Sequence, residues 1–112
     1  MEKSKDNFFK DVYEVVKVIP YGRVTSYGAV ADYLGSKGKA RMVGWAMHGA
    51  SRTNGIPAHR VVNSSGQMTG KIYFGDNRME KLLEAEGIKV SKDRILDFKK
   101  VFWNPSVELK LD

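Results

Sequence analysis

The chain has 112 residues, with 19 Lys and Arg against 13 Asp and Glu, two His and no Cys, and a formal net charge of +6. This length predicts one domain over residues 1–112, with a core at about 7–103 and a tail at 104–112 that frays. The absence of Cys excludes disulfides and thiol catalysis, and two His without clustered carboxylates nearby predict no metal site. The lack of a long apolar run predicts a cytoplasmic protein with no membrane partner.

The first predicted element is an amphipathic helix. Apolar residues recur at helical spacing from Phe8 to Ile19, and Asp6 precedes them as an N-cap. Pro20 pushes the residue before it out of the helical region, so it ends the helix. This helix is expected to pack in the core.

Two short helices follow, joined by a turn that contains glycine. The first is predicted from Tyr27 to Leu34, with Thr25 or Ser26 as its cap. The second is predicted from about Lys39 to 49. Their outline is that of a helix-turn-helix, in which the second helix enters a DNA groove.

The second of these helices carries the chemistry. Lys37, Lys39 and Arg41 lie at its N-terminus, where the helix dipole is already positive, and a docked phosphate would offset both effects. Ala40 and Gly44 form a shallow face, which permits either close approach to a nucleic acid or tight packing against a neighbouring element. The larger apolar residues are expected in the core: Val43, Trp45 and Met47.

A β-hairpin is predicted after the second helix. Val61 and Val62 begin a strand, residues 63–66 form a turn, and residues 67–70 return as the second strand. Such a wing contacts phosphates, and Ser65 at its tip is the expected contact.

The C-terminal part contains a fourth helix and a second hairpin. Asp76 is expected to cap the helix and Gly87 to end it, and residues 88–98 form a small hairpin around Lys92 and Asp93. The predicted fold class is therefore mostly α with a small β-wing, a winged-helix-like single domain.

Several motifs resemble, in order, the DNA-binding domain of the O6-alkylguanine-DNA alkyltransferases. They are PYGRVTSYG at 20–28, KARMVGWA at 39–46, PAHRV at 57–61 and LLEAEG at 82–87. In the repair enzymes the third motif carries the nucleophilic cysteine, and Ala58 replaces it here. The chain therefore resembles the alkyltransferase-like proteins, the small non-repairing branch of the family.

The resemblance implies a set of DNA contacts. Tyr27 would crowd the 3′ phosphate of the target nucleotide, and Arg41 would fill the space that a flipped base leaves in the duplex. The other expected DNA contacts are Lys37, Lys39, Ala40, Gly44 and Ser65. The expected pocket for the alkylguanine is formed by Tyr27, Arg52, Pro57, Ala58 and Val61. Two interpretations of Arg52 stay open: a cation–π contact with the base, and a solvated loop residue.

The resemblance implies no catalytic residue. His59 and Glu86 match the family's proton-transfer pair, and without a thiol we expect them to remain as a hydrogen-bonded support. Arg60 is expected to brace the loop by hydrogen bonds to a carboxylate or to backbone carbonyls. Ala50 lies where the repair enzymes carry an active-site asparagine.

The predicted function is recognition of O6-alkylguanine in double-stranded DNA by base flipping, without removal of the alkyl group. We expect a monomer without cofactors, and the resemblance implies nucleotide excision repair proteins as partners. Two alternatives remain: a winged-helix regulator that reads undamaged sequence, and an alkyltransferase inactivated by replacement of its Cys with Ala.

Overall fold

The computed structural model describes residues 5–51 and 55–109. Its elements in chain order are α1 (Lys5–Val16), β1 (Thr25–Ser26), α2 (Tyr27–Tyr33), α3 (Ala40–Ala50), the 3₁₀ turn η1 (Ala58–Arg60), β2 (Val61–Val62), the 3₁₀ turn η2 (Lys71–Tyr73), α4 (Arg78–Ala85), β3 (Val90–Ser91), β4 (Arg94–Ile95), α5 (Phe98–Val101) and α6 (Pro105–Glu108). This mostly helical architecture with very short strands confirms the predicted fold class. In the described part of the chain no helix is long and apolar enough to cross a membrane.

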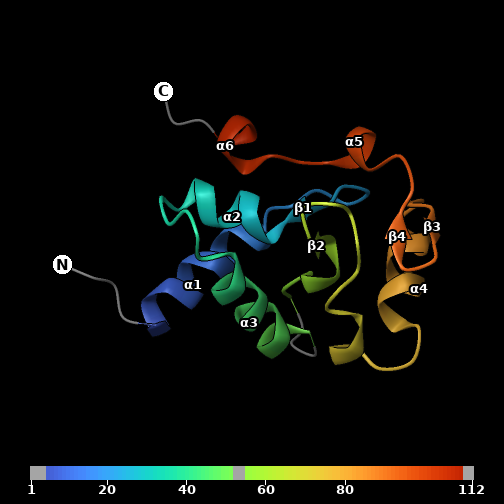
Figure 1. The fold of residues 1–112 in the computed structure, drawn as a ribbon, viewed down its shortest axis with the longest axis horizontal. Helices are drawn as coiled ribbons and strands as arrows, with labels where there is room; N and C mark the ends of the chain where they lie inside the picture. Colours follow the sequence, from blue (N-terminus) through green and yellow to red (C-terminus); the bar gives the residue numbers. More distant parts are fainter. Residues whose placement is uncertain (1–4, 52–54, 110–112) are drawn as a thin grey trace.

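The helices α1, α2 and α3 form one side of the molecule. Figure 1 shows them together, with β1 and β2 at the centre and α4 with the β3–β4 hairpin on the other side. Helix α3 packs against both α1 and α2. The core spans both sides, because Val12, Val43, Val62 and Leu83 are all fully buried. One hydrophobic cluster therefore supports every surface described below.

Helix α1 begins and ends earlier than predicted. It starts at Lys5, so Asp6 is its second residue and not its N-cap. After the helix the backbone tightens, since the amides of Val18 and Ile19 donate to carbonyls three residues earlier, at 3.2 and 3.1 Å. The helix has therefore already ended when the chain reaches Pro20.

The start of α2 is fixed by a cap and by a strand pair. Ser26 Oγ accepts the amide of Ala29 at 3.1 Å, which confirms the predicted N-cap. The residues before Tyr27 form β1, which pairs in parallel with β2. This pairing joins the helix-turn-helix to the segment that contains Ala58.

The predicted hairpin over residues 61–70 is wrong in its pairing. Strand β2 pairs with β1, and Gln67 forms an antiparallel bridge with Arg94. The side-chain oxygen of Asn63 accepts the amides of Ser65 and Gln67 at 3.0 and 2.8 Å, which closes a tight turn. The turn directs the chain toward β4, so it does not return along β2.

The second predicted hairpin is confirmed. Strands β3 and β4 pair antiparallel around Lys92 and Asp93, whose φ angles of 50° and 63° are those of a two-residue hairpin turn. Helix α4 starts after Asn77 and not after Asp76 as predicted.

The first residues of the predicted tail form a short helix. Asn104 Oδ1 accepts the amide of Ser106 at 3.0 Å and caps α6, which packs against α2. Pro105 and Trp103 are buried, and the Trp103 amide donates to the Val24 carbonyl at 2.7 Å. Burial and capping thus order this end of the chain.

Candidate nucleic-acid interface

Helix α3 separates its small and charged residues from its core residues. Val43 and Met47 are buried as predicted, while Arg41 is exposed. Trp45 was expected in the core, and its exposed fraction is 51%. Its position two residues after Val43 turns it away from the buried stripe, since that stripe repeats every three to four residues.

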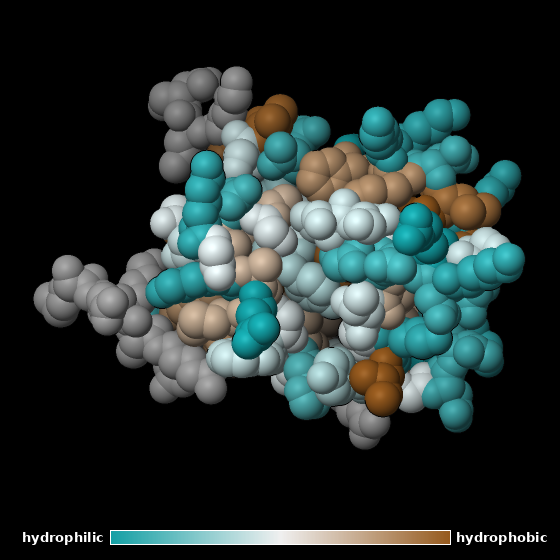
Figure 2. All heavy atoms as spheres, in the orientation of Figure 1, coloured by the Kyte–Doolittle hydropathy of each residue, from teal (hydrophilic) through white to brown (hydrophobic). Residues whose placement is uncertain are grey.

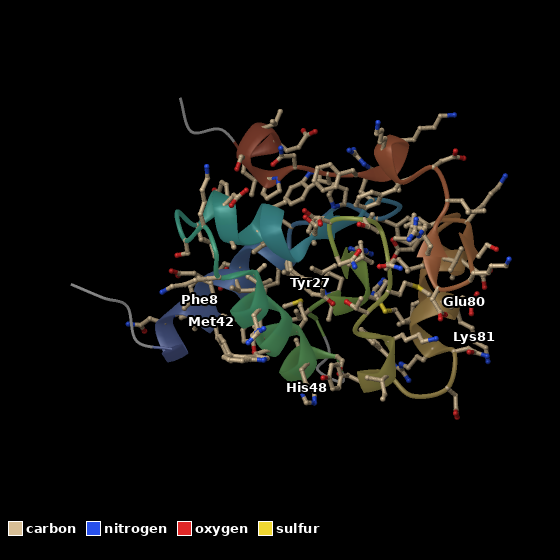
Figure 3. The ribbon with its side chains drawn as sticks, in the orientation of Figure 1. Phe8, Tyr27, Met42, His48, Glu80 and Lys81 are labelled. Atoms are coloured by element: carbon tan, nitrogen blue, oxygen red, sulfur yellow. The ribbon has the colours of Figure 1, made fainter. Side chains whose placement is uncertain are left out.

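A groove of about 360 Å³ runs along this exposed face. Its lining residues come from α2, α3 and the segment around η2: Tyr27, Ala40, Arg41, Gly44, Trp45, Thr69, Gly70 and Tyr73. Four residues expected to contact DNA therefore lie together, namely Tyr27, Ala40, Arg41 and Gly44. In Figure 3 Tyr27 lies near the middle of the molecule beside α3, and His48 lies at the lower end of that helix.

Tyr27 is half-buried in the groove. Burial raises the pKa of its hydroxyl, and this effect outweighs a hydrogen bond with Thr69 that acts to lower the pKa. A Cβ atom on Gly70 would lie 2.9 Å from the Tyr27 oxygen, so a larger residue at position 70 would require the phenol or the backbone to shift. The raised pKa keeps Tyr27 a neutral phenol.

Gly44 is open to solvent at its Cα. A Cβ atom built on it meets no other atom within 4 Å. The small residue is therefore not required for packing against a neighbouring element. Of the two interpretations that the sequence allowed, this observation favours close approach of an external molecule.

The other residues expected to contact phosphates lie in exposed turns. Lys37 and Lys39 are exposed before α3, whose first turn has no acidic residue and no side-chain cap. Ser65 is exposed at the tip of the turn that Asn63 closes. Backbone amides at an uncapped N-terminus, flanked by lysines, form an environment that suits a phosphate.

The residues expected to form the alkylguanine pocket do not all meet in one cavity. Pro57 and Ala58 line a second cavity, of about 400 Å³, and this cavity shares no lining residue with the groove of Tyr27. Val61 is 1% exposed in β2 and lines neither cavity. Arg52 lies outside the described residues.

Residues of η2 and its neighbours were missed by the sequence analysis. Tyr73 lines the groove and the adjacent Phe74 lines the cavity. The rings of Tyr73 and His48 stack with centroids 3.7 Å apart, and Ser51 Oγ lies 2.9 and 3.1 Å from the carbonyl oxygens of these two residues. The sequence feature that could have indicated these residues is the aromatic pair at 73–74, which follows the predicted second strand of the wing.

Behind Ala58, one carboxylate organises the backbone. The side chain of Glu86 is 5% exposed, and its carboxylate accepts hydrogen bonds from the Gly22 amide at 2.7 Å, from His59 Nε2 at 2.6 Å and from Arg60 Nε at 3.0 Å. Arg60 also donates from Nη1 to the Ile19 carbonyl at 2.8 Å. The expected hydrogen bond between His59 and Glu86 and the expected bracing by Arg60 are both present.

The pKa values of this pair favour a neutral ring beside a carboxylate anion. Burial lowers the pKa of His59 below its usual 6.5, although the hydrogen bond with Glu86 opposes the change. Burial alone would raise the pKa of Glu86, but the hydrogen bonds from Gly22, His59 and Arg60 outweigh it and lower the pKa below the usual 4.5. The chain contains no cysteine, so the pair has no thiol to deprotonate.

These directions predict loss of stability in acid. A lowered pKa in the folded state means that the unfolded chain binds more protons, so stability rises with pH through that range. The contribution of His59 is complete above pH 6.5 and decreases as pH falls through its lowered pKa, and that of Glu86 decreases below pH 4.5. Urea denaturation at a series of pH values measures this. His59→Asn should remove the first decrease, and the prediction is wrong if this variant and the parent respond alike.

Comparison with known proteins identifies the family. Residues 7–88 match the family described as "6-O-methylguanine DNA methyltransferase, DNA binding domain". The chain is 36% identical over 105 residues to alkyltransferase-like protein 1 of Schizosaccharomyces pombe, with 89% of this chain and 97% of that protein covered. It is 39% identical over 106 residues to the DNA base-flipping protein of Escherichia coli, with 93% and 79% covered.

A solved structure supports the same assignment. The crystal structure of S. pombe Atl1 in complex with damaged DNA containing O6-carboxymethylguanine is similar with a TM-score of 0.82 and 35% sequence identity, over 94% of this chain and 100% of that one. The match of the family over residues 7–88 and these nearly full-length likenesses agree. The chain therefore belongs to the 6-O-methylguanine DNA methyltransferase family and resembles its alkyltransferase-like members along nearly its whole length.

Proposed function

We propose that this protein binds duplex DNA that contains O6-alkylguanine, flips the modified base out of the stack and leaves the alkyl group in place. The observation that carries the proposal is the single groove that joins Tyr27 to Arg41 along the open face of α3. The relatives that are named as alkyltransferase-like and base-flipping proteins support it.

Each residue has a separate part in this proposal. Arg41 enters the duplex in place of the flipped base, and Tyr27 presses on the adjacent phosphate. Lys37, Lys39 and Ser65 bind backbone phosphates and fix the orientation of the protein on the duplex.

The alkyl group would be held near Ala58. In this proposal the flipped base enters the cavity that Pro57 and Ala58 line, and Arg52 contacts the base. Ala58 has no reactive atom, so the bond between the alkyl carbon and O6 of guanine stays intact. We further propose that the protein acts as a monomer in the cytoplasm and passes the lesion to nucleotide excision repair proteins.

The direct test is the affinity for one duplex with and without a single O6-methylguanine at fixed salt. We expect at least about tenfold tighter binding to the damaged duplex, which corresponds to 1.4 kcal/mol. Mass spectrometry of the recovered strand should find the methyl group still attached. Equal affinities would support a regulator that reads undamaged DNA, and loss of the methyl group would reveal a transfer reaction.

A further prediction concerns Gly44. Gly44→Ala should raise the free energy of unfolding by up to about 1 kcal/mol, since alanine favours the helix and the added methyl group meets no protein atom. The same methyl group should lower DNA affinity about tenfold by holding the duplex away from α3. Both quantities are measured by urea denaturation and fluorescence anisotropy.

Gly49→Ala is the matched control in the same helix. Its Cβ atom would make an ordinary contact with the Tyr13 hydroxyl at 3.7 Å, and it does not line the groove. This variant should gain stability without loss of affinity. A Gly44→Ala protein that binds DNA like the parent would rule out close approach at this residue.

A further inference from the structure

The C-terminal part of the chain forms a strongly basic surface that follows the family-matched residues 7–88. Its exposed cations lie on the β3–β4 hairpin and on α5, and we refer to them as the C-terminal basic surface: Lys89, Lys92, Arg94, Lys99 and Lys100. Residues 89–100 also contain Asp93 and Asp97, so five positive and two negative charges give +3, half of the net charge of +6. In Figure 2 hydrophilic residues dominate this side of the molecule and surround a smaller hydrophobic strip.

These cations have no carboxylate partner among residues 5–51 and 55–109. The ion pairs found there involve other residues, and Asp93 is occupied by Lys71 at 2.6 Å. Like charges held on one short hairpin and turn repel one another. A bound polyanion would relieve this repulsion.

Backbone contacts attach the surface to the turn that carries Ser65. The Ile95 amide donates to the Gly66 carbonyl at 2.9 Å, and Gln67 forms a bridge with Arg94. On the same turn Gly66 has a φ of 82°, and a Cβ atom there would lie 3.0 Å from the Phe98 ring. The hairpin and α5 therefore both lie directly against this turn.

The character of the surface favours DNA over a protein partner. Protein interfaces have apolar centres, whereas interfaces with DNA are polar and positively charged. Within residues 89–100 Leu96 is the exposed large apolar side chain, and five cations surround it in the sequence. In the proposed complex Ser65 binds one phosphate of the duplex. The cations lie beside the Ser65 turn, so neighbouring phosphates of the same DNA backbone would contact them.

We propose that the C-terminal basic surface binds backbone phosphates of the duplex beside the lesion and so extends the DNA contact beyond the groove of α3. This inference rests on the proposed function for its placement of Ser65 on DNA. It adds a second binding site that reads no base and therefore acts equally on damaged and undamaged duplexes.

The test is the salt dependence of binding for the double variant Lys99→Ala/Lys100→Ala. Each lost phosphate contact reduces the slope of log affinity against log salt by about 0.9, so we expect a reduction of about 2 on a duplex of about 30 base pairs. Affinity at low salt should fall about tenfold or more, with and without O6-methylguanine.

Lys10→Ala/Lys81→Ala is the control matched in charge. Both lysines are exposed, on α1 and α4, and their removal changes the net charge equally. The proposal is overturned if this control reduces the slope as much as the Lys99/Lys100 variant, or if the latter leaves the slope unchanged, as it would if the surface binds an acidic protein. The double variant Lys92→Ala/Arg94→Ala tests the hairpin half of the surface, and it should reduce the salt slope by a similar amount.

The two proposals fail in different ways. Failure of the proposed function gives equal affinity of the parent protein for damaged and undamaged duplexes, while the salt slope on the undamaged duplex still reports on the basic surface. Failure of the present proposal leaves lesion preference intact. All the substituted side chains are exposed, and equal melting temperatures will show that the variants are folded.

Discussion

Arg41→Ala should lower the affinity for a duplex with O6-methylguanine by roughly thirtyfold, about 2 kcal/mol, and abolish base flipping. Extrusion of a base costs a few kcal/mol, and the guanidinium offsets part of this cost by filling the gap in the stack. Arg41 is exposed and lines the groove with Tyr27, so its truncation should not change the fold. A 2-aminopurine beside the lesion measures flipping, since its emission rises when it unstacks.

Lys37→Ala and Lys39→Ala are the comparison variants. They should weaken binding to damaged and undamaged duplexes alike and reduce the salt slope by about one each, because phosphate contacts carry no information about the base. If Arg41→Ala behaves in the same way and retains the 2-aminopurine signal, Arg41 is a phosphate contact and the assignment as a finger is wrong.

The largest loss of stability is expected for Glu86→Ala. Its carboxylate pairs with His59 and Arg60 and accepts the Gly22 amide, and the side chains of Arg60 and His59 are only 16% and 13% exposed. Removal of one partner of a buried ion pair leaves the other charge uncompensated, so the free energy of unfolding should fall by about 3–5 kcal/mol. This is a large part of the 5–15 kcal/mol typical of a domain, and urea denaturation at neutral pH measures it.

Two further variants show how much of the lost free energy of unfolding comes from the ion pair itself. Glu84→Gln removes an exposed carboxylate from the last turn of α4, which ends just before Glu86, and should change stability by less than about 0.5 kcal/mol. Arg60→Met/Glu86→Met replaces both charges with apolar groups and should recover part of the loss, since no charge remains buried without its partner. A double variant as unstable as Glu86→Ala would mean that the Gly22 bond dominates.

Much of the fold follows from short-range rules. Helical spacing of apolar residues places Val43 and Met47 in the core, Ser26 has the side chain that caps α2, and Lys92 with Asp93 occupies the turn of a hairpin. Each of these depends on neighbours within a few residues. The motif at 57–61 in turn places an alanine where the repair enzymes of the family have their nucleophile.

The pairing of distant segments required the tertiary structure. The bridge between Gln67 and Arg94 replaces the predicted return of the wing, because a strand of two residues has no alternation that could define its partner. The same long-range pairing brings the basic hairpin against the turn of Ser65.

The sequence by itself determined the existence of the first four helices, the family, the absent thiol and the residues that the resemblance marks for DNA binding, because spacing, caps and motifs are local properties. The tertiary structure alone decided that Tyr27 and Arg41 share one groove while Ala58 lines a separate cavity. It also decided that the space beside Gly44 is open. These features depend on which surfaces meet when the core is buried, and no period or spacing along the chain encodes that.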